Sequence, residues 1–482
     1  MTRALVIRLL LAAVLACASV IDRAPAQTRD PQPPTPIPSR SNNNKAIWTI
    51  VGGAAVAIIG LVIGTRIFDP PVDQANPPSP PPREPQTAQL PPNLPTQGPA
   101  PTGPGQIAPA LRNGFFLPPP GETRFVSNEV MLDIPSTLQA PILDVIAARH
   151  AMTRLETRSF RLTGRTLHRW RIDAGATVPD MIRGLSGERQ VAGAAPIYLF
   201  QLSQDALVPA SGDQYAPDKI RLTEAHRLAT GSRMLIAMID SGVDARHPDL
   251  AGAVNANLDA ATGDLAPHPH GTGMAGAIAA RQTMLSVAPR VSLLTVRAFN
   301  AGANNGEGTT FNIIKGLDWA AERGARIVNM SFAGPRDPSL ERALQSASGK
   351  GIILIAAAGN AGPRSPPLYP AADKNVIAVT ATDVDDKLFT NANRGRHIAI
   401  AAPGVDILVP APDGTYQLTT GTSVASAEVS GVVALMLERN PRLTSADVRR
   451  ILTASAKKLG PNDQFGAGLI DAFAAVTAAK PR

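Results

Sequence analysis

The segment RMLIAMIDSGVD, residues 233–244, is an apolar run that ends at an aspartate and a turn. Its apolar residues are nearly continuous, which is typical of a strand buried on both faces of a parallel sheet. The same pattern recurs in VSLLTVRAF (291–299), RIVNMSF (326–332), GIILIAAAGN (351–360) and NVIAVTATD (375–383). Helical spacing of apolar residues appears between these runs, at 309–324 and 339–351. Residues 205–482 are therefore predicted to form an α/β domain with a doubly wound, mostly parallel sheet.

A smaller domain is predicted before this one, over residues 121–204. NEVMLDI alternates like a strand, TLQAPILDVIAARH has helical spacing, and TRSFRL and TLHRWRI flank Thr163-Gly164 as a hairpin. A helix in VPDMIRGL and a strand in VAGAAPIYLFQL complete the order βαββαβ. This order predicts a small α+β, ferredoxin-like domain. Its histidines have no evident catalytic partner.

The first 120 residues contain two apolar segments and a proline-rich stretch. Residues 1–26 resemble a signal peptide that ends in APA, whereas residues 46–68 carry no charge before Arg66 and are long enough to span a membrane. Basic residues precede the second segment and acidic ones follow it, so we expect an anchor at 46–68 with residues 1–45 in the cytoplasm and the rest outside. Whether residues 4–20 are a cleaved signal or a second membrane segment stays open. Residues 69–120 are predicted to be a disordered spacer.

Composition excludes several classes of protein. The net charge of +8 comes from dispersed arginines without interleaved aromatic residues, so nucleic acid is not expected as a partner. The chain has one cysteine, which excludes an intrachain disulfide and a cysteine metal site.

Three polar residues of the large domain form a candidate catalytic set. Asp240 ends the first buried strand, His270 opens HGTGMAGAIAA, and Ser423 lies in GTSVASAEVSGVV before an apolar helix. A serine nucleophile needs a base, and the base needs a carboxylate that fixes its tautomer. Asn360 ends the strand AAAGN, where its amide could donate to an oxyanion together with the backbone N–H of Ser423.

The blocks MIDSGVD, HGTGMAG, VNMSFAGP, AAAGN and GTSVAS resemble, in this order, the signature blocks of the subtilisin-like serine peptidases. The resemblance implies a triad of Asp240, His270 and Ser423 with Asn360 as oxyanion donor. It also implies the two backbone walls of the primary specificity pocket, which would pair with an extended substrate: Ser331, Phe332 and Ala333 on one side and Ala356, Ala357, Ala358 and Gly359 on the other. The domain at 121–204 resembles the inhibitory propeptide of the family, which would be removed by self-cleavage between residues 203 and 213.

Three further expectations concern the surroundings of this site. His268 is expected to be a loop residue at the rim of the site. The small residues after His270 are expected to let the helix that they form pack closely behind the site. Leu368 is expected to make the primary pocket shallow, which favours small apolar side chains. Asp249 matches a calcium ligand of the family, but the segment RQTMLS is shorter than in calcium-binding members. No cofactor is therefore expected, and whether the enzyme depends on calcium stays open.

The sequence thus predicts a self-processing serine endopeptidase that acts on polypeptides outside the cytoplasm, periplasmic or extracellular. It is expected to be a monomer, tethered by its N-terminus or released after processing. Two alternatives remain: an inactive relative that binds peptides as an adaptor, and an esterase that uses the same groups.

Overall fold

The computed structural model describes residues 111–173, 175–203, 206–209 (backbone), 213–263, 266–300 and 306–481. The chain divides into two units, residues 1–101 and 102–482, and all described residues belong to the second. The predicted segments 1–45 and 46–68 and most of the spacer lie outside the described residues. Within the described part of the chain, no helix is long and apolar enough to cross a membrane.

The N-terminal domain, residues 111–203, has the predicted βαββαβ order. Its antiparallel sheet has the order β2-β3-β1-β4 and two helices pack against it. Its elements are β1 (Phe125–Asp133), α2 (Ala140–Arg149), β2 (Met152–Phe160), β3 (Arg165–Ile172), α3 (Val178–Leu185) and β4 (Gly193–Leu202). Trp170, Val130, Leu132 and Ile182 are fully buried between the sheet and the helices.

The boundary of this domain differs from the prediction. Residues 111–120, assigned from composition to the spacer, pack on the domain instead. Phe115 is 5% exposed and forms a bridge with Ala194, and the Arg112 guanidinium donates to the carbonyl of Ser186. Phe115 and Arg112 could have indicated this contact, because a disordered spacer rarely contains such residues. The proline-rich composition of the whole stretch outweighed them in the prediction.

The large domain is built on the predicted parallel sheet, with strand order β15-β14-β13-β11-β6-β8-β7. Every neighbouring pair in it is parallel. The strands are β6 (Leu235–Asp240), β7 (Val254–Asp259), β8 (Ser292–Arg297), β11 (Ile327–Met330), β13 (Ile353–Ala357), β14 (Val376–Thr382) and β15 (Ile398–Pro403).

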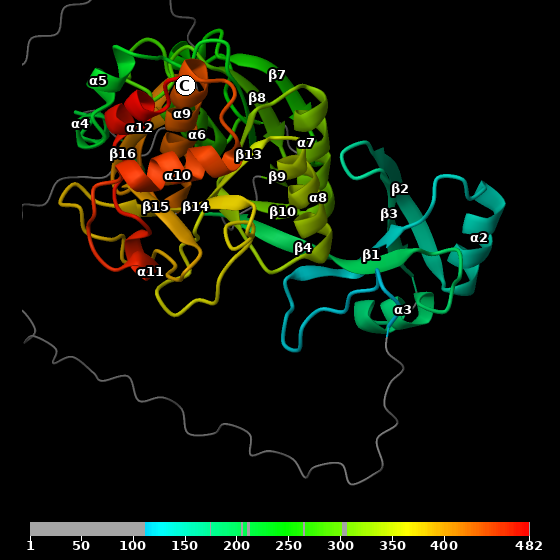
Figure 1. Ribbon diagram of the computed structural model, residues 1–482. Helices are drawn as coiled ribbons and strands as arrows, with labels where there is room; N and C mark the ends of the chain where they lie inside the picture. Colours follow the sequence, from blue (N-terminus) through cyan, green and yellow to red (C-terminus); the bar gives the residue numbers. More distant parts are fainter. Residues whose placement is uncertain are drawn as a thin grey trace, which may run out of the picture. The chain divides into compact units, whose positions relative to one another are not determined.

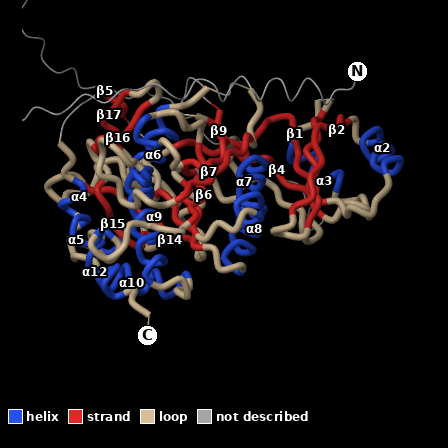
Figure 2. Tube along the Cα trace, turned by 90° about the horizontal axis from the view of Figure 1, so that it is seen from above, coloured by secondary structure: helices blue, strands red, loops and turns tan. Residues whose placement is uncertain are grey.

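Successive residues of the central strands face two different helix layers. Ile236 and Met238 of β6 pack with α6 (Pro269–Ala279) and α9 (Thr422–Arg439), whereas Ala237 and Ile239 pack with α7 (Thr310–Glu322) and α8 (Pro338–Gly349). Burial of both faces explains the continuous apolar runs of the sequence. Figures 1 and 2 show the sheet between these two helix layers.

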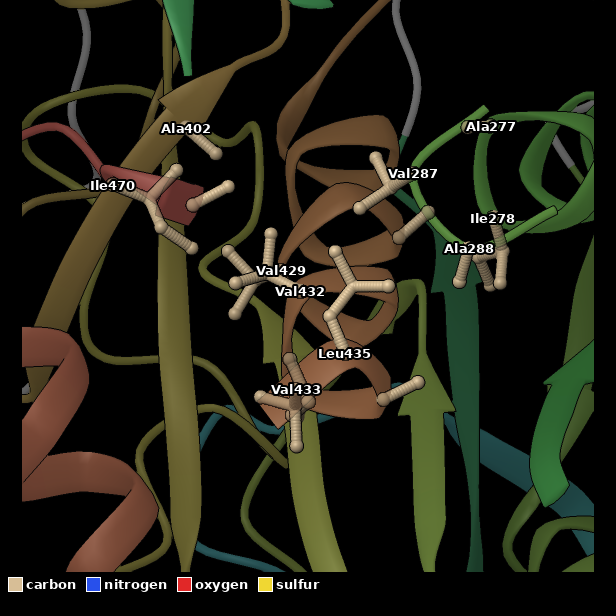
Figure 3. Close-up of a cluster of buried hydrophobic side chains, with 14 of the residues drawn as sticks. Ala277, Ile278, Val287, Ala288, Ala402, Val429, Val432, Val433, Leu435 and Ile470 are labelled. Atoms are coloured by element: carbon tan, nitrogen blue, oxygen red, sulfur yellow. The ribbon is translucent and has the colours of Figure 1, made fainter. Parts of the chain in front are cut away.

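Helix α9 lies at the centre of the larger core. Every residue from Thr422 to Leu437 is buried. Figure 3 shows side chains of this helix, among them Val429 and Leu435, between Ala402 and Ile470 on one side and Ala277 and Ile278 of α6 on the other. A helix buried on all sides must be made of small and apolar residues, which accounts for the composition of VASAEVSGVVALML. The N-terminus of α9 is thereby held rigidly at the carboxyl edge of the sheet.

The last strand of the N-terminal domain, β4, continues into a second sheet of the large domain. There it lies between β10 (Glu307–Thr309) and β12 (Phe332–Ala333), antiparallel to both, and β9 (Phe299–Asn300) pairs with β10 (Figure 1). A third sheet has the order β16-β17-β5, formed by β16 (Ile407–Ala411), β17 (Thr415–Thr420) and β5 (Ala206–Pro209). The remaining helices are α4 (Ala216–Lys219), α5 (Leu222–His226), η1 (Pro248–Leu250), α10 (Ser445–Ser455), α11 (Asn462–Phe465) and α12 (Ala472–Ala478).

Candidate active site

Asp240, His270 and Ser423 occupy the ends of three elements. Asp240 is the last residue of β6, and His270 and Ser423 are each the second residue of their helices, α6 and α9. All three residues are at most 1% exposed. In an α/β sheet the carboxyl ends of the strands form the edge where functional groups gather, and this edge brings the aspartate and the histidine together.

The carboxylate of Asp240 holds the His270 ring in one orientation. His270 Nδ1 lies 2.6 Å from Asp240 Oδ1, which also accepts the backbone N–H of Ser241 at 2.7 Å. A carboxylate at this distance keeps the proton on Nδ1 and leaves Nε2 as the basic nitrogen. Nε2 is buried and has no hydrogen-bond partner among the described residues. The ring is therefore in the tautomer that a general base requires.

Glycines allow α6 to approach β6 and β16 closely. A Cβ atom on Gly271 would stand 2.7 Å from the carbonyl oxygens of Ser241 and Gly242, and one on Gly276 would stand 2.1 Å from Pro410 Cδ. Both separations are shorter than a real Cβ contact. The glycines after His270 are thus needed for packing, as the sequence suggested.

Ser423 is hydrogen bonded to the end of β4 and not to His270. Its Oγ donates to the carbonyl oxygen of Ser203, and its backbone N–H donates to the same oxygen at 3.3 Å. Ser203 in turn donates its N–H to the carbonyl of Ser331 at 3.1 Å. The carbonyl group of Ser203 therefore lies at the hydroxyl of Ser423 and at the N-terminus of α9.

The strand that leads to Ser203 is held on both edges. β12 pairs Phe332 with Leu202 and Ala333 with Gln201, and β10 pairs Gly308 with Phe200. An extended segment between two antiparallel partners satisfies its backbone groups in both directions, which is how a cleft binds a peptide as an added strand.

One of the two predicted walls pairs with this segment and the other does not. Phe332 and Ala333 pair with β4, and the carbonyl of Ser331 accepts the N–H of Ser203. Ala356 and Ala357 belong to β13 and pair with β11 and β14 inside the central sheet, and the N–H of Ala358 donates to Val379. The second pairing strand is β10, which the sequence analysis missed. Its EGT sequence is too short to show a strand pattern.

Asn360 follows β13 and its side-chain amide is fixed by Thr422. The Oδ1 atom accepts the backbone N–H of Thr422 at 3.1 Å and its hydroxyl at 2.8 Å. The hydroxyl oxygen of Thr422 accepts the N–H of Gly359 at 3.0 Å. With Oδ1 facing Thr422, the Nδ2 donor points away from it.

A hollow beside Ser203 is lined by Asn360, Ala333, Gly334 and Leu368. Leu368 is 7% exposed, and its Cδ1 lies 3.0 Å from the place of a Cβ atom on Gly359, a residue at φ +102°. The leucine side chain thus fills space beside Gly359, which fits the expectation of a shallow pocket.

Asp249 does not have the surroundings of a calcium ligand. Its Oδ1 accepts the backbone N–H groups of Gln282 at 2.8 Å and Thr283 at 2.6 Å, and its Oδ2 accepts the Tyr416 hydroxyl at 2.9 Å. Calcium needs a shell of oxygen ligands, whereas N–H and O–H donors surround this carboxylate. The shortened loop therefore wraps around Asp249 and supplies two of these donors to its carboxylate. Among the described residues, no group of three or more His, Cys, Asp or Glu could hold a metal ion.

Replacing Asp249 with alanine is expected to destabilise the domain by about 3 kcal/mol, because the N–H groups of Gln282 and Thr283 and the Tyr416 hydroxyl lose a charged acceptor. Asp249→Asn keeps one acceptor oxygen and should lose less. Thermal melting in an inactive Ser423→Ala background measures both without autolysis. Calcium should shift the melting temperature of wild type and of Asp249→Asn equally; a shift that disappears in Asp249→Asn would contradict this role.

His268 is the last residue of the loop before α6, and its ring has a role that the sequence did not indicate. It is the residue that caps the N-terminus of α6, and its Nδ1 accepts the backbone N–H of His270 at 3.2 Å. Burial, followed by the nearby charge of His270, lowers the pKa of the His268 imidazole. The ring is therefore uncharged at neutral pH and able to accept.

Comparison with known proteins agrees with this geometry. The family model described as "Subtilase family" matches residues 231–468. Thermitase from Thermoactinomyces vulgaris is 36% identical over 275 residues, which cover 55% of this chain and 96% of the relative. Subtilisin DY from Bacillus licheniformis is 34% identical, over 54% of this chain and 99% of the relative.

Among solved structures, fervidolysin from Fervidobacterium pennivorans, described as a keratinolytic enzyme related to subtilisin, superposes with a TM-score of 0.64. The match covers 75% of this chain and 62% of that one. At 24% identity it supports the fold alone.

Proposed function

This chain belongs to the subtilase family and is a serine endopeptidase, and we propose that Ser423 is its nucleophile, His270 its general base and Asp240 the carboxylate that orients the base. His270 Nε2 takes the proton of Ser423 Oγ as the oxygen attacks a peptide carbonyl, and later gives a proton to the leaving amine. The Asp240–His270 distance of 2.6 Å supports these roles.

The observation that carries the proposal is the position of the Ser203 carbonyl. Its oxygen accepts both the hydroxyl and the backbone N–H of Ser423. A nucleophile must reach the carbonyl that it attacks, and a helix N-terminus stabilises the negative charge that develops on the oxygen. We infer that the Ser203–Gln204 bond is the one that the enzyme cleaves in its own chain.

In this reaction Ser423 Oγ forms an ester with the carbonyl carbon of Ser203. The bond from that carbon to the nitrogen of Gln204 breaks, and the nitrogen leaves with the proton that His270 carried. Water then attacks the ester with His270 again as base, which releases the carboxylate of Ser203 and restores the Ser423 hydroxyl. Atoms and charges balance without a cofactor.

The segment before this bond indicates which substrates fit. Ser203 is small and lies beside Leu368, whereas Phe200 lies 5.9 Å from the Phe332 ring, edge to face. A Cβ atom on Gly334 would stand 2.4 Å from the Phe200 ring, so this glycine makes room for it. The preferred polypeptides would carry a small residue at the cleaved bond and an aromatic residue three positions earlier.

The N-terminal domain fits the role of a propeptide that remains bound after cleavage. Besides the pairing of β4, its Leu162 N–H donates to Asp318 at 2.7 Å and its Glu156 accepts from Lys315 at 3.1 Å, both on α7. Burial raises the pKa of the Asp318 carboxyl. These contacts would hold the domain in the cleft as an inhibitor once the chain is cut.

Labelling with a fluorophosphonate tests the assignment of the nucleophile. The processed protein should carry the label on the peptide that contains Ser423, and the Ser423→Ala chain should carry none. A label on another serine of a processed and active protein would contradict the proposal.

Asn360 is proposed as the second oxyanion donor, through Nδ2. Asn360→Asp is expected to lower kcat about 10²- to 10³-fold with little change in KM, because a donor to the transition-state oxygen is replaced by a negative charge. Aspartate keeps an acceptor for Thr422, so the local fold should be retained, which thermal melting can check. Activity within tenfold of wild type would exclude the role.

We also propose that the enzyme works outside the cytoplasm. The apolar segments at 4–20 and 46–68 of the sequence support this location. Fractionation of cells that express the whole chain, followed by detection of the catalytic domain, tests it. Recovery from the cytoplasm alone would contradict it.

A further inference from the structure

The ring of His268 is the next member of a hydrogen-bonded chain that begins at the proposed base. From His270 Nδ1 the chain runs to Asp240 Oδ1 at 2.6 Å, then to Ser241 Oγ at 3.2 Å, and then to His268 Nδ1 at 3.1 Å. The N–H of His270 donates back to His268 Nδ1 at 3.2 Å. These contacts close a ring that holds the Asp240 carboxylate and the start of α6 in one arrangement.

Ser241 is the link that transmits the position of His268 to Asp240. Its hydroxyl oxygen accepts the N–H of Gly271 at 3.0 Å, and its backbone N–H donates to Asp240. The hydroxyl has a single proton, which reaches either Asp240 Oδ1 or His268 Nδ1. The state of the His268 ring therefore decides which bond this hydroxyl makes.

We propose that His268 is a positioning residue of the active site, and that its protonation in acid disables the enzyme by a route separate from protonation of His270. This inference rests on the proposed roles of Asp240 and His270. It concerns a residue that touches neither the substrate nor the reacting atoms.

The physical reason lies in what Nδ1 does in each state. Unprotonated, it accepts the N–H of His270 and caps α6. Protonated, it no longer accepts, and the capping bond to the backbone N–H of His270, the proposed base, is lost. The new positive charge also lies at a helix N-terminus and close to His270, where it opposes the imidazolium that forms during catalysis.

The groups that face the ring set the direction of the pH effect. The charged groups that act on it are His270, the second residue of α6, and Asp240, at the end of β6. Gln417 of β17 contributes a neutral amide, which donates to the carbonyl of Pro269. Burial is the largest influence and lowers the pKa of His268. Protonation of His268 therefore has no effect on activity at neutral pH, and activity is lost as the pH falls below the ordinary histidine range.

The test compares His268→Asn with His268→Ala in the processed enzyme, by kcat and KM for one peptide substrate across pH. Asparagine is a good helix cap that does not titrate, so His268→Asn should keep kcat within about threefold near pH 8. Alanine removes the acceptor, and kcat should fall about 10- to 100-fold with little change in KM, as expected for a misplaced base.

The acid side of the profile separates positioning from a structural role. In wild type, log(kcat/KM) should steepen to a slope of two as the pH falls, and in His268→Asn the slope should remain one. His226→Asn is the matched control, since this histidine bonds the carbonyl of Val287, and it should keep the wild-type profile.

Two results would overturn the inference: a slope of two that persists in His268→Asn, or a His268→Ala enzyme with wild-type kcat at pH 8. A wrong assignment of the catalytic residues would give a different result from a wrong inference about His268. In that case Ser423→Ala or Asp240→Asn would itself remain active, whereas failure of this inference alone leaves both variants inactive.

Discussion

Ser423→Ala is expected to leave the whole chain uncut at the Ser203–Gln204 bond and to lower peptide hydrolysis about 10⁶-fold, the loss typical of removing the nucleophile of such a triad. The fold should not change, because Ser423 lies at the rigid N-terminus of α9 and alanine suits a buried helix. The Ser423 backbone N–H, which donates to Ser203, is retained. Hydrolysis of a chromogenic peptide and gel analysis of the chain measure both effects.

Ser430→Ala is the matched control for this variant. Ser430 lies in the same helix, is buried, and donates to Asn329 and to the carbonyl of Ser426. It makes no hydrogen bond with Ser203 or His270 among the described residues, so processing should proceed. Processing by Ser423→Ala, or its loss in a folded Ser430→Ala chain, would contradict the assignment.

Asp240→Asn is expected to lower kcat about 10⁴-fold, because an amide favours the wrong tautomer of the base. The amide that this substitution introduces can donate to His270 Nδ1, which moves the ring proton to Nε2, where it blocks acceptance of the serine proton. KM should change little, since β10, β12 and the pocket are untouched. Steady-state kinetics of the processed enzyme measure the loss.

Asp244→Asn controls for the removal of a nearby buried carboxylate. Asp244 accepts the backbone N–H groups of Arg246 and Asp413 and lies in the loop after β6. Its replacement should lower stability by about 1 kcal/mol and leave kcat within about threefold. If Asp240→Asn and Asp244→Asn lowered kcat equally, the proposed role of Asp240 in orienting His270 would be contradicted.

The local features of the site followed from the sequence because they depend on short stretches of chain. A buried apolar run that ends in Asp-Ser-Gly predicts a carboxylate at the edge of a parallel sheet, and this is where Asp240 lies. The fold and the βαββαβ order of the smaller domain were likewise predicted correctly. Each of these conclusions needs only the periodicity within one element.

What the sequence did not predict depends on contacts between distant segments. The pairing of β4 with β10 joins residues about 100 positions apart, and no local pattern in Glu307–Thr309 indicates it. The position of His268 depends on Ser241, 27 residues earlier. Ala356 and Ala357 pair with β11 and β14 inside the central sheet, and their resemblance-based assignment to a wall of the specificity pocket stays a prediction.

The intact masses of the purified products give the sharpest test of cleavage by Ser423 at the Ser203–Gln204 bond. Wild-type chain, expressed whole beside Ser423→Ala, should yield a fragment that ends at Ser203 and one that begins at Gln204, while the variant remains uncut. These masses would establish both that Ser423 is the nucleophile and that it cleaves the Ser203–Gln204 bond. Cleavage at the same bond in both chains, or a wild-type chain that is folded and stays whole, would contradict the account.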